Sequence, residues 1–339
     1  MDFDKLVTRF NQFGGYRLVW VYTKIGVGGT ILNSFCQCLV KRQSFKAIYP
    51  EVLKRIEPML IAKYGSKVQE LKKFNSSRDL EHEHPKVIWW CWLQGIEVAP
   101  PIVRACYNSL VHGEWFSVNG YKVNVIDAEN WKDYVELPDY IVKKWKKKQI
   151  PPAMFTDLLR LQLLIKYGGT WIDSTVLYTG FKGSRVLCKQ SEQARAQEFK
   201  KYLEADLFLF QYTPEGTTED ISISNWFISA HSNNEVLMTL RDMLFAYWKD
   251  YSCTLDYYIF HLFFSMVAKE YPEQIAAMPY GYSMNSIVLL HHWGETFDQK
   301  KWDKLTSKVS FHKLAFRVSQ SVIENKNDYY NWIVLNYTS

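Results

Sequence analysis

The sequence lacks a strong excess of charge of either sign, and this excludes one large class of partners. Lys and Arg number 41 against 35 Asp and Glu in 339 residues, which gives a net charge of +6. The excess is small and dispersed, and no motif of an RNA- or DNA-binding module is present. We therefore expect no nucleic-acid partner.

Cysteines are few, and their spacing does not indicate a metal site. The six are Cys36, Cys38, Cys91, Cys106, Cys188 and Cys253. No two of them have CxxC spacing, and the chain is too long for a small disulfide scaffold. Free thiols in a reducing cytosol are the simplest interpretation.

Long uninterrupted hydrophobic runs are also missing. Residues 17–40 are apolar, but Arg17, Lys24 and three polar residues interrupt them, whereas a membrane span needs about 20 nearly uninterrupted apolar residues. The first residues, MDFDKLVTRF, lack the basic-then-apolar layout of a signal peptide. We expect a cytoplasmic protein in which residues 17–40 form a buried or interfacial helix.

What is present is the composition of a folded α/β protein, with 47% hydrophobic and 22% charged residues. Apolar residues recur at helical spacing before residue 80, and the polar run 72–85 is the best linker. We therefore predict an N-terminal helical region over residues 1–84, with membrane or partner contact as one role. A second domain then covers residues 85–339.

The second domain begins with a strand–helix–strand pattern. KVIWWCWLQG (86–95) is typical of a buried parallel strand followed by a loop. PPIVRACYNSLVHG (100–113) predicts a helix with proline at its start, and YKVNVID (121–127) a second strand. This pattern predicts a mostly parallel central sheet flanked by helices. Ligands bind such sheets beyond the carboxyl ends of the strands, near Gln94 and Gly95.

A lysine-rich segment, VKKWKKKQIPP (142–152), has two interpretations that the sequence leaves open. It is either a solvated helix end or a segment that attracts phosphates or anionic lipid headgroups.

The stretch FTDLLRLQLLIKYGGTWIDSTVLY (155–178) predicts a helix, a glycine turn and a strand. Thr156 is the expected cap, which places Asp157 and Arg160 in the first turns, on one face. As an exposed ion pair they would contribute less than about 1 kcal/mol. As a site, the carboxylate would accept sugar hydroxyls and the guanidinium would bind phosphate. Asp173 is expected at the strand's far end.

This stretch resembles the (S/T)DLLR…YGG…D region of the capsular polysaccharide synthesis proteins. That family is related to glycosyltransferase family 32 and, more distantly, to the sugar-transferring domains of large clostridial toxins. VIWWCWLQG (87–95), SNWFISAHSNNEV (224–236), LDYYIFHLFF (255–264) and SFHKL (310–314) resemble further segments, of which 224–236 corresponds to a family helix. The resemblance covers about residues 85–315. It implies a GT-A (Rossmann-like) fold, a nucleotide-sugar donor, usually a UDP-sugar, and transfer with retention.

The resemblance also implies roles for individual residues. Trp92 matches a ring that stacks on uracil, beside Gln94 and Gly95. Asp157 and Arg160 match residues that hold the donor sugar, and Asp173 matches the first acid of an Asp-x-Asp element. The remaining positions are Asn225, near the transferred sugar; Asp256, which orients or deprotonates the acceptor; and His312, which reaches a metal or the diphosphate. His261 is either a site residue or a packed helix residue.

The sequence lacks the second acid of that element, because Thr175 stands in its place. Relatives hold Mn²⁺ or Mg²⁺ there, and hard cations prefer carboxylate oxygen to a neutral hydroxyl. Two solutions remain. Either Asp173, His312 and another acid still hold a metal with the diphosphate, which we favour, or cations such as Arg160 and nearby lysines replace it.

The resulting hypothesis is a hexosyltransferase at the inner face of the cell membrane. It would transfer a sugar from a UDP-hexose to a lipid-linked oligosaccharide of a capsule or surface polysaccharide. The competing hypothesis is a catalytically degenerate sugar-nucleotide-binding or scaffold protein, supported by Thr175. An adaptor role, in which the first 80 residues dock to a membrane or partner, is compatible with the enzyme. A metal-dependent phosphate hydrolase would need a cluster of acids that the sequence does not show.

Overall fold

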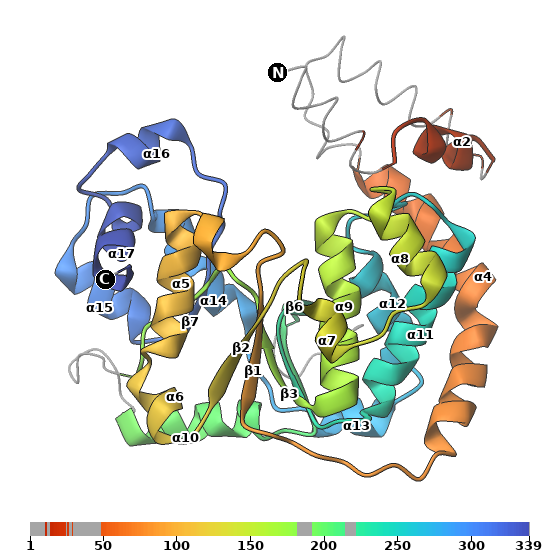
Figure 1. The fold of residues 1–339 in the computed structure, drawn as a ribbon, viewed down its shortest axis with the longest axis horizontal. Helices are drawn as coiled ribbons and strands as arrows, with labels where there is room; N and C mark the ends of the chain where they lie inside the picture. The colour runs from red at the N-terminus through yellow and green to blue at the C-terminus, as the bar shows by residue number, and fades with distance from the viewer. Residues whose placement is uncertain are drawn as a thin grey trace. The chain divides into compact units, whose positions relative to one another are not determined.

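The computed structural model describes residues 11, 14–24, 26, 29, 49–181, 192–213 and 222–338. The chain divides into two compact units (Figure 1), each assembled from separate stretches of sequence. Unit 1 comprises residues 1–79, 136–161 and 235–272, and unit 2 comprises residues 80–135, 162–234 and 273–339. The predicted domain boundary at residues 84 and 85 stays a prediction.

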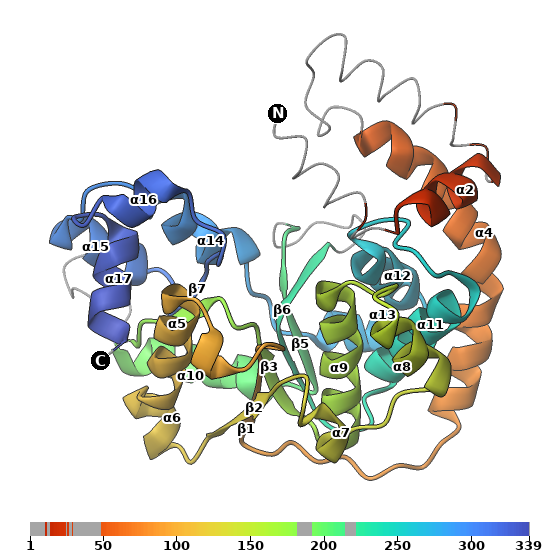
Figure 2. The same ribbon diagram turned by 45° about the horizontal axis from the view of Figure 1, so that its top comes forward.

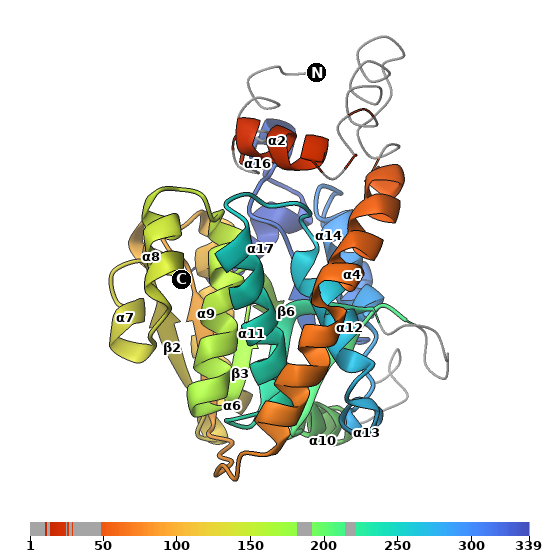
Figure 3. The same ribbon diagram turned by 90° about the vertical axis from the view of Figure 1, so that its right-hand side faces the viewer.

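The described part of unit 1 is helical. Its helices are α2 (Tyr16–Lys24), α4 (Tyr49–Ser76), α8 (Asp139–Lys146), the first ten residues of α9 (Pro152–Tyr167), α11 (Glu235–Asp250) and α12 (Ile259–Ala268). In α4 the buried residues Ile56, Leu60, Tyr64 and Val68 are four apart and form one face. This face explains why α4 lies along α11 and α12 (Figure 3).

The lysine-rich segment forms part of this packing. The Nζ atom of Lys144, in α8, donates to the carbonyl oxygen of Tyr251 at 2.7 Å and also to that of Trp248, near the end of α11. Trp145 stacks on Phe155 at 4.1 Å between ring centroids. Lys144 and Trp145 are therefore structural, and the role of the other lysines stays open.

Unit 2 contains a central sheet, which within the described residues has five strands in the order β2-β1-β3-β6-β5. These are β1 (Val87–Cys91), β2 (Lys122–Ile126), β3 (Gly169–Ile172), β5 (Leu207–Gln211) and β6 (Ile223–Ala230). Strand β1 pairs in parallel with β2 and β3, whereas β6 is antiparallel to both β3 and β5. The predicted α/β fold with a mostly parallel sheet is confirmed.

Helices flank this sheet, and β4 (Val176–Tyr178) and β7 (Phe311–Lys313) form a second, antiparallel sheet. The helices are η2 (Ile96–Val98), α5 (Pro101–Val111), α6 (Glu114–Val118), α7 (Trp131–Tyr134), the end of α9, α10 (Glu192–Leu203), α13 (Pro272–Ala277), α14 (Ser283–His292), α15 (Gln299–Thr306), α16 (Gln320–Glu324) and α17 (Tyr329–Tyr337). Helix α5 lies beside α17 (Figure 2).

Two predicted elements differ from the structure. The single strand over residues 170–178 is two strands, because a turn at residues 173–175 passes the chain from the central sheet to the small one. The segment 224–236 begins as strand β6 and becomes helix α11 only at Glu235, so the expected helix is wrong for residues 224–234. Its β-branched and aromatic residues pair with β3 and β5 instead.

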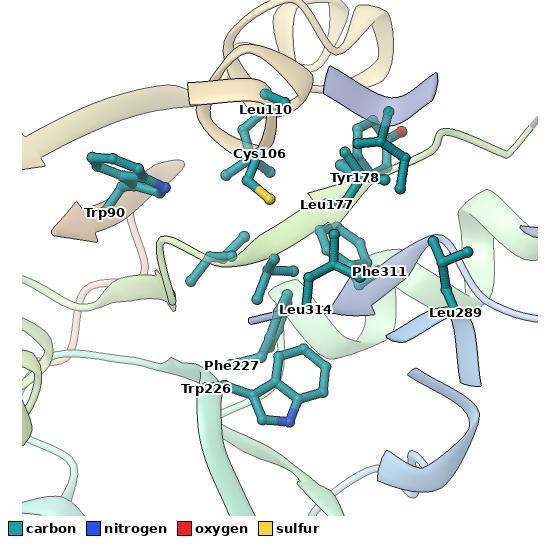
Figure 4. Close-up of a cluster of buried hydrophobic side chains, with 14 of the residues drawn as sticks. Trp90, Cys106, Leu110, Leu177, Tyr178, Trp226, Phe227, Leu289, Phe311 and Leu314 are labelled. Carbon is teal, nitrogen blue, oxygen red and sulfur yellow. The ribbon is translucent and has the colours of Figure 1, made fainter. Parts of the chain in front are cut away.

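A large aromatic and aliphatic core joins the two sheets of unit 2. Trp90 of β1, Phe227 of β6 and Phe311 of β7 are almost fully buried in it. Figure 4 shows Leu177 and Tyr178 of β4 in the same cluster, with Cys106 of α5. This core fixes β7 against the end of β3.

Within the residues that the structure describes, no helix is both long enough and apolar enough to cross a bilayer.

Candidate functional site

The carboxyl ends of β1, β2 and β3 lie at one edge of the central sheet, since these strands are parallel. Just past β1, the backbone nitrogen of Trp92 donates to the carbonyl oxygen of Ile126 at 3.0 Å. Past β3, the backbone nitrogen of Asp173 donates to the carbonyl oxygen of Trp226 at 2.8 Å. Because Asn225 precedes Trp226, five predicted site residues (Trp92, Gln94, Gly95, Asp173 and Asn225) belong to this edge of unit 2.

An aromatic pair marks the β1 end of this edge. The half-buried ring of Trp92 makes an edge-to-face contact with Phe316, at 5.4 Å between centroids. Phe316 is 41% exposed. The following turn is closed by the backbone nitrogen of Gly95, which donates to the carbonyl oxygen of Trp92 at 2.9 Å, and Gln94 is exposed. A flat ligand ring can therefore stack on one ring of this pair and contact the other at its edge.

The turn after β3 carries a bridged polar cluster. The Asp173 carboxylate accepts a hydrogen bond from Nε1 of Trp171 at 2.9 Å on Oδ1. Its Oδ2 accepts from Nζ of Lys313 at 2.7 Å, and the same ammonium donates to Oγ1 of Thr175 at 2.7 Å. Lys313 thus joins the two positions at which an Asp-x-Asp element would have its acids.

His312, the neighbour of Lys313 in β7, has different surroundings. Its Nε2 lies 3.2 Å from Oγ1 of Thr179, and its side chain is buried. Successive side chains of a strand point to opposite faces, so His312 lies on the face away from Asp173. Burial lowers the pKa of His312 to about 4, which keeps the ring neutral near pH 7.

Asp157 and Arg160 are together in unit 1, where they form a buried ion pair. Nη2 of Arg160 lies 3.2 Å from Oδ1 of Asp157, and the two residues are 4% and 5% exposed. Helix α9 begins at Pro152, and Oγ1 of Thr156 donates to the carbonyl of Ala153, so the expected Thr156 cap is wrong. The pair lies in the second and third turns, because the prolines start the helix earlier than we expected.

The segment that leads into α12 carries the other unit 1 residues. Asp256 is 3% exposed, and its Oδ1 accepts a hydrogen bond from the backbone nitrogen of Tyr258 at 2.6 Å. Arg160 lies over the Phe260 ring at 6.0 Å. Burial first, and then the charge of Arg160, lowers the pKa of His261 to about 4. His261 is therefore a neutral, packed helix residue.

The predicted site residues thus form two groups, one in each unit. Within the described residues, no three His, Cys, Asp or Glu side chains are arranged as a metal site. Asp173 offers a carboxylate already bonded to an ammonium, and Thr175 a neutral hydroxyl bonded to the same ammonium. As arranged, this donor set does not suit a hard divalent cation.

Sequence reasoning missed Lys313 and Phe316. Lys313 is adjacent to His312, which we singled out in SFHKL. Because neighbouring side chains of a strand point to opposite faces, either His312 or Lys313 could have been the residue that faces Asp173. The neutral Thr175 was the signal that a nearby cation was needed.

A comparison with family profiles matches residues 37–333 to the capsular polysaccharide synthesis protein family. This match covers most of the chain. The chain belongs to this family. The resemblance drawn from the central motif is therefore confirmed for capsular polysaccharide synthesis.

Other comparisons of this capsular polysaccharide synthesis protein add little. Curated proteins give no significant match. Among solved structures, the PaToxG glycosyltransferase is similar at 13% identity and a TM-score of 0.35, with 83% of this chain and 97% of that chain covered. So low a score carries no argument about fold or activity.

Proposed function

We propose that this capsular polysaccharide synthesis protein is a glycosyltransferase that uses a nucleotide-sugar. The observation that carries the proposal is the edge of unit 2, where the half-buried Trp92, in contact with Phe316, and a charged turn follow neighbouring parallel strands. Ligands of open α/β sheets bind at this edge. Membership in a family named for polysaccharide synthesis supports a sugar as the transferred group.

The chemistry of the edge suits a nucleoside diphosphate. Trp92 would stack on the base, with Phe316 at the edge of the base, while the turn at Asp173 would face the ribose and diphosphate. Asn225 would contact the transferred sugar. The finer assignments (a UDP-hexose donor, retention, a lipid-linked acceptor and contact with the inner membrane face) belong to the proposal and follow from the family resemblance.

The unit 1 group keeps the roles that the resemblance assigns. Asp157 and Arg160 would hold the donor sugar, and Asp256 would orient the acceptor hydroxyl or take its proton. Asp157→Asn keeps the shape of the side chain and removes its charge, so its activity, measured beside its melting temperature, separates this role from the stability that the buried ion pair provides.

A ligand panel tests the proposed function. We expect at least one UDP- or GDP-sugar to raise the melting temperature and to be slowly hydrolysed or transferred. Trp92→Ala should weaken binding of that ligand roughly 5- to 150-fold, because stacking on one base contributes about 1–3 kcal/mol to binding. Trp20→Ala, which removes a 60% exposed ring from α2, is the matched control.

Two outcomes count against the proposal. If no nucleotide-sugar binds, with either EDTA or Mn²⁺ present, the glycosyltransferase assignment is wrong. If a nucleotide-sugar binds but is neither transferred nor hydrolysed, the degenerate sugar-nucleotide-binding protein replaces it.

A further inference from the structure

The cluster at the turn after β3 contains a cation supplied by the chain itself. We propose that the ammonium group of Lys313 takes the place of a divalent cation, so that the protein binds the diphosphate of its donor without a metal. This inference rests on the proposed function and names the group that performs its charge stabilisation.

The position of Lys313 is the first argument. Its ammonium lies 2.7 Å from both Asp173 Oδ2 and Thr175 Oγ1, and so bonds to both positions at which an Asp-x-Asp element would have its acids. Strand pairing fixes the lysine backbone, since Lys313 is opposite Val176 in the β4–β7 register. The backbone nitrogen of Leu314 also donates to the carbonyl oxygen of Thr175 at 2.8 Å. The cation is therefore held by the fold before any ligand arrives.

Charge is the second argument. Two carboxylates and a divalent cation carry no net charge together, and neither do Asp173, Thr175 and Lys313. A threonine in place of the second acid, together with an ammonium in place of the metal, keeps that balance. A divalent ion added beside Lys313 would place three positive charges next to one carboxylate, and like charges at this distance repel.

Access is the third argument. The side chains of Lys313 and Asp173 are 24% and 21% exposed, so solvent and ligand reach them. An ammonium has three N–H donors, and the two bonds to Asp173 and Thr175 use two of them. The third can donate to a diphosphate oxygen. Ammonium groups bind phosphate as compact point charges.

The positive charge of Lys313 is needed in the proposed reaction when the bond between the donor sugar and the diphosphate breaks. The bond from the anomeric carbon to the diphosphate oxygen breaks, and its electron pair stays on the diphosphate. The acceptor oxygen forms the new bond to that carbon, and its proton passes to a base or to the departing diphosphate. An ammonium already in place at the diphosphate stabilises the growing negative charge without moving.

Calorimetry on the full chain tests the inference. It measures the binding of UDP and GDP and, for comparison, the binding of the nucleosides uridine and guanosine. The wild-type protein should bind its diphosphate with equal affinity in EDTA and in Mn²⁺. Lys313→Met should weaken binding of the diphosphate roughly 10- to 100-fold, which is the loss expected when a hydrogen bond to a charged group is removed. Binding of the nucleoside should be unchanged, because only the diphosphate contacts the ammonium.

Two further variants separate charge from structure. Lys313→Arg should restore most of the affinity. Lys301→Met removes a lysine that is paired with Glu295 at 2.5 Å elsewhere in unit 2, and it should leave the affinity for the diphosphate unchanged. Melting temperatures confirm that each variant is folded.

The outcomes separate this inference from the proposed function. Binding that EDTA abolishes in the wild-type protein overturns the role of Lys313 and leaves the glycosyltransferase intact. If Lys313→Met weakens the binding of diphosphate and nucleoside equally, the lysine is structural, and the proposed role of Lys313 is also overturned. If neither diphosphate binds under any condition, the proposed function fails, and this inference fails with it.

Discussion

Asp157 and Arg160 show how burial changes the meaning of an ion pair. The pair is almost inaccessible to solvent, at 3.2 Å between Oδ1 and Nη2, so it was desolvated when the chain folded. Two buried charges stabilise each other, but either one alone in the same place is strongly unfavourable. Any variant that removes one partner therefore affects stability as well as a site.

Asp157→Ala should lower the free energy of unfolding by about 3–5 kcal/mol, because it leaves the Arg160 guanidinium buried without this carboxylate. Glu204→Ala is the control, since it removes the exposed pair of Lys200 and Glu204 and should cost only about 0.3–0.5 kcal/mol. Urea unfolding followed by circular dichroism measures both. Similar losses for the two variants would show that burial does not govern the Asp157 pair.

At the scale of elements, the junction of α9 and β3 decides where Asp173 lies. Gly168 ends the helix with a φ of 72°, and its backbone nitrogen donates to the carbonyl oxygen of Leu164 at 2.8 Å. A Cβ at this position would meet the carbonyl oxygen of Glu83 at 2.4 Å and the backbone nitrogen of Ser232 at 2.8 Å. Neither backbone atom moves easily, so the junction requires glycine.

Gly168→Ala should destabilise the protein by about 3 kcal/mol or more, from left-handed strain together with these clashes. Gly120→Ala isolates the strain, because Gly120 has a φ of 76° and no atom within 4 Å of its added Cβ. It should cost about 1–2 kcal/mol. Thermal unfolding compares the two, and equal shifts in melting temperature would mean that the contacts at Gly168 relax without cost.

Local patterns predicted β1 from its continuous apolar run, α5 from the proline at its start, and β2 and α9 from the spacing of their apolar residues. They did not predict the turn at residues 173–175, although Asp173, Ser174 and Thr175 are three consecutive polar residues between apolar ones, a composition typical of turns. That turn exists because β7, far along the chain, pairs with β4. Lys313 was missed for the same reason: it is 140 residues from Asp173, and no local pattern records so distant a partner.

At the scale of the whole molecule, helix α4 is part of the core of unit 1. Leu60 is 1% exposed, on the face that packs against α11 and α12, whereas the next residue, Ile61, is 46% exposed. Nδ2 of Asn75 also donates to Oγ1 of Thr239 in α11 at 3.0 Å. Residues of the N-terminal segment are therefore required for the packing of residues 235–272.

Leu60→Ala should lower the free energy of unfolding by about 2–5 kcal/mol through the cavity that it leaves. Ile61→Ala, one residue later on the solvent side, should change it by no more than about 0.5 kcal/mol. Chemical denaturation of the two variants provides the comparison. A small effect of Leu60→Ala would mean that α4 is only loosely attached.

The packing of α4 also has a consequence for synthesis on the ribosome. Asn75 and Thr239 are 164 residues apart, so α4 emerges long before the helices that cover its apolar face. That face stays open to water, or to chaperones, until α12 has been made, and exposed apolar surface of this kind promotes aggregation. Folding of unit 1 must therefore finish late in translation, and a chain cut short before residue 268 is expected to aggregate rather than to leave a stable fragment.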